Sequence, residues 1–216
     1  KPQIVQAVKD KTQRTLKLDG EIKLSFFPSV GGRLGRATLS ERASDKEFAG
    51  VEEMRIAVKL MPLLSKRVVV DTVEVKSLRA DIVRFKDGKT NVDDLAGGGD
   101  KAAPAPKGAE GQFMIDIDHV LIENATLTFT DQAAGARYAL AKINLKTGRI
   151  ASGVPTNIEL AFAAQSDKPK LSLETALKTR LTFDLDKQRY SVEGLDLNAK
   201  GNAAGYSNLV VNVKGD

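Results

Sequence analysis

Apolar and polar residues alternate without interruption along residues 170–186, KLSLETALKTRLTFDLD. Because successive side chains of a β-strand point to opposite faces, this pattern predicts one strand with an apolar face and a charged face. Fifteen such residues would span about 50 Å, whereas a usual strand has only about 5–6 residues. The large apolar side chains of this strand are Leu171, Leu173, Leu177, Leu181, Phe183 and Leu185.

The remainder of residues 113–216 repeats the alternation in further runs, and no helical period interrupts them. The phase of the alternation slips by one residue near Lys142 and again near Gly194. We expect the apolar positions of these strands to line one surface together with the long strand: Leu127, Phe129, Tyr138, Leu140, Ile158, Leu160, Phe162, Leu195 and Leu197.

The first 95 residues begin with a different period. Residues 2–16 carry apolar side chains at three- and four-residue steps, which predicts one amphipathic helix with Pro2 in its first turn. After Gly20 the period becomes two, and Pro62 breaks the resulting strands. Asp-Gly-Lys at residues 87–89 is typical of a hairpin turn.

Residues 96–112, AGGGDKAAPAPKGAEGQ, have no period and are rich in Gly, Ala and Pro, which predicts a flexible insertion. We therefore expect three segments. Residues 1–95 hold the helix and a β segment, residues 96–112 are the insertion, and residues 113–216 continue the same sheet.

A faint internal similarity relates the two β-rich parts. Residues 68–85, VVVDTVEVKSLRADIVRF, align with residues 113–130, FMIDIDHVLIENATLTFT, at an offset of 45. Two copies of a strand pair hint at a repeating sheet, although two simple alternating patterns also match by chance.

The long apolar face needs a cover. Burying six Leu or Phe side chains is worth roughly 9–18 kcal/mol, which is comparable to the whole stability of a domain, about 5–15 kcal/mol. The predicted helix reaches about 22 Å and cannot cover a face of about 50 Å. A second sheet could complete a closed sandwich or barrel, or an open trough could be filled by lipid tails. Periodicity alone does not choose between these two solutions.

Composition removes several classes of function. The chain has no Cys, which excludes disulfides and thiolate chemistry, and no apolar run approaches the ~20 residues of a membrane-spanning helix. Lys and Arg exceed Asp and Glu by 19 to 14 in residues 1–95, whereas residues 96–216 have 14 of each. Sparse aromatic residues and unclustered basic residues argue against nucleic acid. Since the first residue is Lys, we expect a processed or excised piece of a longer protein.

Candidate chemistry is equally scarce. The carboxylate pairs Glu52–Glu53 and Asp93–Asp94 lie in charged, turn-like contexts. Asp116 and Asp118 would share a strand face while His119, the only histidine, points to the other, so a metal site there would need distant ligands. Nucleophile-elbow, dinucleotide-binding and Walker motifs are absent. We predict no enzymatic activity, no metal and no cofactor.

Two blocks carry a resemblance to a known family. Residues 68–95 end in Asp-Gly-Lys-Thr-Asn-Val-Asp-Asp-Leu, which resembles the signature turn of the AsmA family, with Val92 in place of the usual Trp. Phe113–Ile150 contains Thr-Asp-x-x-x-Gly-x-x-Tyr and Leu-x-Thr-Gly-Arg pieces that are similar to a second block of that family. The resemblance extends along almost the whole chain.

This resemblance implies an elongated, strongly twisted and curled antiparallel-rich sheet, a taco-like groove similar to chorein-type proteins and TamB. It implies a bacterial periplasmic protein that a preceding transmembrane helix, missing from this chain, anchors in the inner membrane. It also implies phospholipids as partners, with an envelope protein as a further possible partner.

We therefore expect the apolar positions named above to line a groove that shields acyl chains during bridge-like lipid transport between membranes and in outer-membrane homeostasis. The alternative is a non-enzymatic scaffold with a closed β-sandwich core that assists outer-membrane protein assembly. A third option, a carbohydrate-active enzyme, would require a cleft with facing carboxylates.

Overall fold

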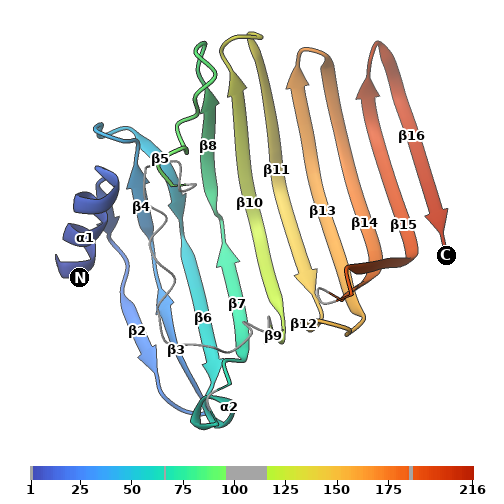
Figure 1. Ribbon diagram of the computed structural model, residues 1–216. Helices are drawn as coiled ribbons and strands as arrows, with labels where there is room; N and C mark the ends of the chain where they lie inside the picture. The colour runs from blue at the N-terminus through green and yellow to red at the C-terminus, as the bar shows by residue number, and fades with distance from the viewer. Residues whose placement is uncertain (1, 66, 96–115, 185–186) are drawn as a thin grey trace.

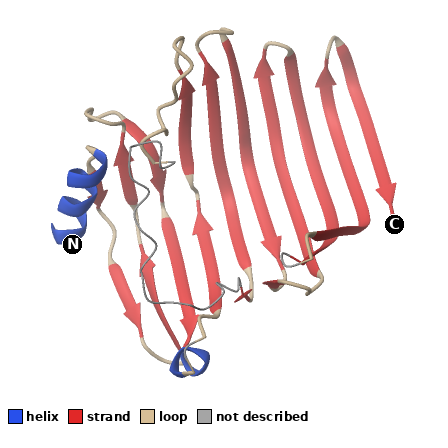
Figure 2. Ribbon diagram, in the orientation of Figure 1, coloured by secondary structure: helices blue, strands red, loops and turns tan. Residues whose placement is uncertain are grey.

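A computed structural model describes residues 2–65, 67–95, 116–184 and 187–216, which form one broad sheet (Figure 1). Figure 2 shows that strands make up most of this part of the chain. Its helices are α1 (Pro2–Thr12), at the edge of the sheet, and the single turn α2 (Leu60–Leu64). The predicted mainly β fold with one N-terminal helix is confirmed.

Four long strands of the N-terminal part are each interrupted near their middle. The successive pieces are β1 (Leu16–Leu18), β2 (Ile22–Ser25), β3 (Ser29–Leu34), β4 (Ala37–Ser40), β5 (Glu47–Val51), β6 (Glu53–Lys59), β7 (Val70–Lys76) and β8 (Arg79–Arg84). In space, β1, β4, β5 and β8 are consecutive neighbours on one side of the interruptions, and β2, β3, β6 and β7 are consecutive neighbours on the other.

The C-terminal part is a meander of long antiparallel strands. Its neighbours in order are β10 (Val120–Asp131), β11 (Ala136–Thr147), β13 (Thr156–Asp167), β14 (Lys170–Asp184), β15 (Arg189–Ala203) and β16 (Tyr206–Gly215). The short strands β9 (Asp116–Ile117) and β12 (Ile150–Ala151) pair beside the turn that joins β11 to β13.

The two parts join through parallel pairing. Strand β10 runs parallel to β7 and β8, with Val120 opposite Val73 and Leu127 opposite Ala80. The described parts of the two similar segments therefore lie side by side, and their paired residues are 47 apart in the sequence. The predicted insertion, residues 96–112, lies outside the described residues, and the division into three segments stays a prediction.

The interruptions of the N-terminal strands lie at one level of the sheet. Backbone hydrogen bonds cross that level between adjacent strands, from Gly20 N to the Arg36 carbonyl at 2.8 Å and from Glu52 N to the Lys76 carbonyl at 3.1 Å. A Cβ atom on Gly20 would lie 2.2 Å from the Arg36 nitrogen, so only glycine fits there. Breaks and bulges of this kind bend strands and increase twist, which accounts for the curl of the open sheet.

No second layer covers the sheet within the described residues (Figures 1 and 2). The buried apolar side chains among them are few and mostly small: Ala37, Phe48, Ala57, Val69, Ala125, Ala136 and Ala151. The helix α1 has no buried residue. Of the two alternatives for the apolar surface, a closed sandwich or barrel and an open trough, the described part of the chain has the open form.

Candidate functional site

Apolar side chains form a continuous row across ten strands of the sheet. Directly paired residues of neighbouring strands point to the same face, so the pairing register shows which side chains lie together. One row runs through Ile22, Leu34, Met54, Val75, Ile122, Leu145, Leu160, Leu177, Leu197 and Val213. With neighbouring strands about 4.8 Å apart, this row is about 43 Å long.

A second row crosses the sheet on the same face, beyond the interruptions. Its members are Leu16, Leu39, Ala49, Ala80, Leu127, Leu140, Ala164, Leu173, Gly201 and Leu209. We call the surface that contains these two rows the apolar face. It includes every long strand of the described part of the chain.

Local irregularities keep the apolar side chains on this face. Lys142 and Gly194 both adopt positive φ, at 52° and 58°, and each lies beside a shift in pairing register. Because an extra residue in one strand reverses the alternation, each bulge restores the phase that the sequence loses there. The two phase slips in the sequence are therefore bulges.

The residues expected to line a groove all lie on the apolar face wherever the structure describes them. Leu127 pairs with Leu140, Phe129 with Tyr138, and Leu160 with Leu177. The others occupy equivalent positions: Ile158, Phe162, Leu171, Leu173, Leu181, Phe183, Leu195 and Leu197. Leu185 lies outside the described residues. That these side chains line a lipid path stays a prediction.

The sequence-based prediction of lining residues did not include the N-terminal strands, which contribute Leu34, Met54 and Val75 to the apolar face. Each piece of an interrupted strand has only two or three apolar positions before the alternation starts again in a new phase, so the sequence pattern is too short to identify its apolar side. The pairing of β7 with β10 places these residues in line with Ile122.

The opposite face is charged. Displaced by one residue from the first apolar row is the row Lys23, Arg33, Arg55, Glu74, Leu121, Lys146, Glu159, Lys178, Asp196 and Lys214. Cross-strand ion pairs connect several of these side chains, including Arg55–Glu74 at 3.7 Å and Lys178–Glu159 at 3.5 Å. The sheet is therefore apolar on one side and hydrophilic on the other.

No candidate side chain of the described part of the chain is fully buried. Leu140 and Tyr138 keep 38% and 40% of their surface exposed, and the other described candidates are half-buried. Their remaining contacts are with neighbouring side chains of the same sheet, such as the Phe129 and Tyr138 rings, whose centroids are 6.2 Å apart. The apolar face thus offers a large accessible surface.

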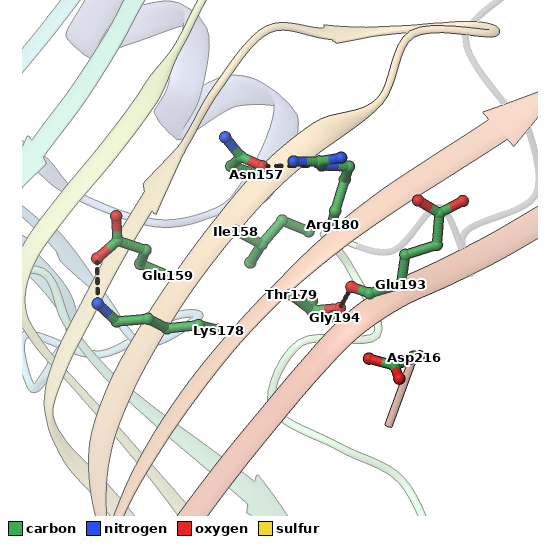
Figure 3. A pocket seen from close by; sticks show the side chains of 9 residues that line it. All are labelled: Asn157, Ile158, Glu159, Lys178, Thr179, Arg180, Glu193, Gly194 and Asp216. Carbon is green, nitrogen blue, oxygen red and sulfur yellow. Dashed lines mark hydrogen bonds and ion pairs between the residues drawn. The ribbon is translucent and has the colours of Figure 1, made fainter. Parts of the chain in front are cut away.

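A separate hollow of about 650 Å³ lies where β13, β14 and β15 meet near Gly194 (Figure 3). In its lining Lys178 forms an ion pair with Glu159, and Arg180 donates to Asn157 at 3.4 Å. Every lining ionisable side chain from β13 and β14 belongs to the hydrophilic side of the sheet. This arrangement holds no isolated acid–base pair that points to catalysis.

The Asp-Ile-Asp-His segment is bound into the sheet by separate partners. Arg149 donates to both carboxylate oxygens of Asp116 at 2.8 Å, and these bonds hold the pKa of Asp116 below its usual value. Asp118 forms an ion pair with Lys59, and His119 lies 3.3 Å from the Thr72 hydroxyl. Among the described residues no group of acidic, Cys and His side chains is arranged to hold a metal ion.

The carboxylate pairs have structural partners as well. Glu52 lies 3.3 Å from Arg79, while Arg33 donates to Glu53 at 2.5 Å and lowers the pKa of that carboxyl. Thr90 donates to Asp93 from both its backbone nitrogen and its hydroxyl. These acids stabilise turns and strand pairs.

Asp94 takes part in a buried network around Arg14. The Arg14 side chain has no solvent exposure and donates to both Asp94 oxygens at 2.8 Å. It also donates to the backbone carbonyls of Ser40, at 3.0 Å, and Asn91, and its guanidinium lies 4.6 Å from the centre of the Phe48 ring. The network ties Arg14, the second residue after α1, to a turn 80 residues later in the chain.

Asn91 completes this junction. Its side-chain oxygen accepts from the Val83 nitrogen at 2.8 Å, and its amide group donates to the Asp81 carbonyl and to Glu41. The turn at residues 87–95 thereby satisfies the free backbone groups of β8 beyond the end of its partner β5, which pairs only at Ala49 and Gly50.

The profile of the AsmA family matches residues 1–208. The chain belongs to the AsmA family. A search of curated proteins finds no matching sequence.

Within this AsmA-family chain, the signature turn has a structural explanation. Within that turn, the side-chain oxygen of Asn91 accepts a hydrogen bond from Val83 of β8, and the carboxylate of Asp94 binds Arg14. Val92, which occupies the position usual for Trp, is half-buried beside them. The signature residues thus join the N-terminal segment to the sheet.

Membership of the AsmA family indicates an envelope-associated protein from a family not known for enzymatic activity. In the described part of the chain, neither helix has the length and apolar character needed to cross a membrane.

Proposed function

We propose that this chain is a periplasmic part of an AsmA-like protein whose apolar face shields phospholipid acyl chains during transport between the two bacterial membranes. The observation that carries the proposal is the apolar face itself, which spans ten strands without a covering layer among the described residues. AsmA family membership is consistent with such a role in the envelope.

The energetics support a lipid occupant. Each Leu or Phe side chain removed from water contributes about 1.5–3 kcal/mol, so a face of this size gains much from a cover. Acyl chains supply apolar contact and need no hydrogen bonds from the sheet. Phospholipid head groups can remain in water on the open side, so no polar group is buried without a partner.

The spacing of the rows suits movement. In the first row, large apolar side chains recur at every strand, about 4.8 Å apart, with Leu145, Leu160, Leu177 and Leu197 in successive strands. An acyl chain shifted by one strand therefore meets nearly the same surface. In this mechanism lipid moves across the strands by passive partition, and no residue makes or breaks a covalent bond.

The test compares two adjacent residues of β14 that point to opposite faces. Leu177→Asp places a charge in the middle of the apolar face, whereas Ala176→Asp places the same charge on the hydrophilic side, opposite Ala161. We expect photoactivatable phospholipid to label the wild type and Ala176→Asp equally, and Leu177→Asp several-fold less, because an unpaired carboxylate disfavours acyl contact. Circular dichroism checks that both variants remain folded.

Organic extraction of protein prepared from bacterial membranes supplies an independent measurement, with co-purifying phospholipid as the expected result. Equal labelling of the two folded aspartate variants would contradict the assignment of the apolar face. Native mass spectrometry that finds a lipid-free dimer, together with loss of that dimer in Leu177→Asp but not in Ala176→Asp, would identify a second copy instead of lipid as the cover.

The edge that β16 presents within the described residues favours a second candidate function, as a scaffold that recruits an envelope protein by strand addition. Among the described residues β16 pairs with β15 alone, and most residues of β16 are exposed. The closed sandwich core expected for a scaffold is not found in the described residues, which form a single open layer. Edge pairing would survive Leu177→Asp, so the variant separates the two functions.

A further inference from the structure

Two neighbouring turns at one end of the sheet expose large apolar side chains. We call them the apolar tip, formed by the turn between β2 and β3 and by α2 with the chain that follows it (Figure 1). Phe27 is 78% exposed and Leu64 is 72% exposed. The exposed large apolar side chains of the tip are Leu24, Phe26, Phe27, Met61, Leu63, Leu64 and Val68.

The pairing register brings these turns together. Ser29, which follows the first turn, is opposite Lys59, the residue before α2. The Lys59 nitrogen donates to the Val69 carbonyl at 2.9 Å, which places Val68 at the same end. The tip is therefore one surface built from segments about 35 residues apart.

Turns at the other end of the sheet have a different character. Gln132–Gly135 joins β10 to β11, and Ala204 and Gly205 join β15 to β16, and these residues are small or polar. An ordinary surface turn has no need of Phe-Phe or Met-Pro-Leu-Leu. The concentration of large exposed side chains at one end marks an interaction site.

The charges near the tip fit an anionic membrane surface. Residues 25–29 and 59–70, which form the tip and its immediate flanks, contain Lys59, Lys66 and Arg67 and no Asp or Glu. Lys59 forms an ion pair with Asp118, while Arg67 lies exposed beside the turn. Basic residues around an apolar insertion are the pattern that anionic lipid surfaces attract.

Some backbone polar groups of the tip form hydrogen bonds within the tip itself. The nitrogens of Ser65 and Arg67 both donate to the Pro62 carbonyl at 3.0 Å, which closes the chain after α2. Internal hydrogen bonds lower the cost of placing a turn at the boundary between head groups and acyl chains, where less water is available to replace them.

We infer that the apolar tip inserts into the interfacial region of a lipid bilayer and docks this end of the sheet on the membrane. The tip continues into the apolar face, because Leu24 lies opposite Gly32 and Gly32 opposite Ile56, next to the first apolar row. The inference that the tip docks on a membrane depends only on the exposed side chains of the tip and their surroundings. That lipid then passes from the bilayer to the apolar face rests on the proposed function.

Flotation with vesicles of phosphatidylcholine mixed with phosphatidylglycerol tests the docking. We expect the 216-residue chain to float with these vesicles. The combined variant Phe26→Ser, Phe27→Ser, Met61→Ser and Leu64→Ser should bind at least about tenfold more weakly, because four large apolar contacts are lost. A matched variant away from the tip, Tyr206→Ser with Val210→Ser, replaces similarly exposed side chains and should float like the wild type.

A fluorescence measurement reports insertion directly. The chain has no Trp, so Phe27→Trp introduces a single reporter at the tip, and Ala134→Trp introduces one at the opposite end. Vesicles should shift the emission of Phe27→Trp to shorter wavelength, and brominated acyl chains should quench it. The emission of Ala134→Trp should stay unchanged.

The outcomes separate docking from lipid shielding. Leu177→Asp should float normally even though its lipid labelling falls, and the tip variant should still be labelled by lipid supplied in dispersed form. Wild-type protein that stays at the bottom of the gradient, or a folded tip variant that floats as well as the wild type, would overturn the docking site. Equal emission shifts of the two Trp reporters would also count against it.

Discussion

Arg14 shows at the scale of a single residue how this open sheet holds its N-terminal edge. Its guanidinium is fully buried, and it is matched by the Asp94 carboxylate, two backbone carbonyls and the Phe48 ring. A buried charge is tolerated only when its hydrogen bonds are made. Removing one partner should therefore cost much more than a surface ion pair contributes.

Asp94→Asn tests this network. We expect it to lower the free energy of unfolding at neutral pH by about 2–4 kcal/mol, because it leaves the buried Arg14 charge with only the Glu41 carboxylate, 3.8 Å away, as an acidic partner. The Arg14 hydrogen bonds hold the pKa of Asp94 below its usual 3.8, so the stability from this pair is complete above that value. In the wild type this stability is lost as the pH falls through the lower folded-state pKa. Urea unfolding across acidic pH should show no such loss from this site in Asp94→Asn.

The adjacent Asp93→Asn is the matched control. Asp93 is exposed, and in the described part of the chain its carboxylate accepts hydrogen bonds from Thr90, so its replacement should cost much less than that of Asp94. If Asp94→Asn were no more destabilising than Asp93→Asn, the Arg14 network would not secure the N-terminal edge.

At the scale of elements, the strands owe their continuous apolar face to irregular positions. Ser77 adopts positive φ at the interruption between β7 and β8, and Asn124 adopts positive φ at a bulge in β10, the strand that runs parallel to them. The Ser77 nitrogen donates to the Glu123 carbonyl at 2.8 Å, so the pairing survives the irregularity. Without these irregularities, the apolar side chains beyond each phase slip would point to the hydrophilic side of the sheet.

Gly201 of β15 offers a test of how closely neighbouring strands approach. It has φ of +147°, and a Cβ atom there would lie 1.9 Å from the Ser172 carbonyl oxygen of β14. Gly201→Ala should lower the free energy of unfolding by at least about 1–3 kcal/mol, as urea denaturation measures. Gly148→Ala, where the nearest atom would lie 3.6 Å away, should stay within about 0.5 kcal/mol. Similar midpoints for both variants would show that β14 and β15 separate easily.

At the scale of the whole molecule, the described part of the chain is a sheet in which each long strand of the C-terminal meander pairs only with its neighbours. Stability in such an array is close to a sum of strand-pair interactions, as in repeat proteins. The end strands should therefore open before the middle of the sheet.

Deleting residues 206–216, which removes β16, should leave the remainder folded. Strand β16 pairs with β15 alone, so its loss removes one interface. We expect hydrogen exchange to show retained protection for amides of β10, β11 and β13, with lower protection confined to β15. Loss of protection throughout these strands would indicate a cooperative core that includes β16.

Much of the fold follows from local patterns. The alternation over residues 170–186 predicts a strand, and β14 covers Lys170–Asp184. The helix predicted over residues 2–16 ends earlier, at Thr12, because Gln13 adopts positive φ and Arg14 enters the buried network. The parallel pairing of β7 with β10 was not predicted, since alternation says nothing about which strand lies beside which.

The sequence by itself determined that long stretches of this chain are strands with one oily and one charged side, because side-chain direction alternates with the backbone. Only the tertiary structure decided that ten such sides join into one surface and that no other described segment lies over it. Strand partners and covering layers depend on contacts between residues far apart in the chain, and a local period contains no information about them.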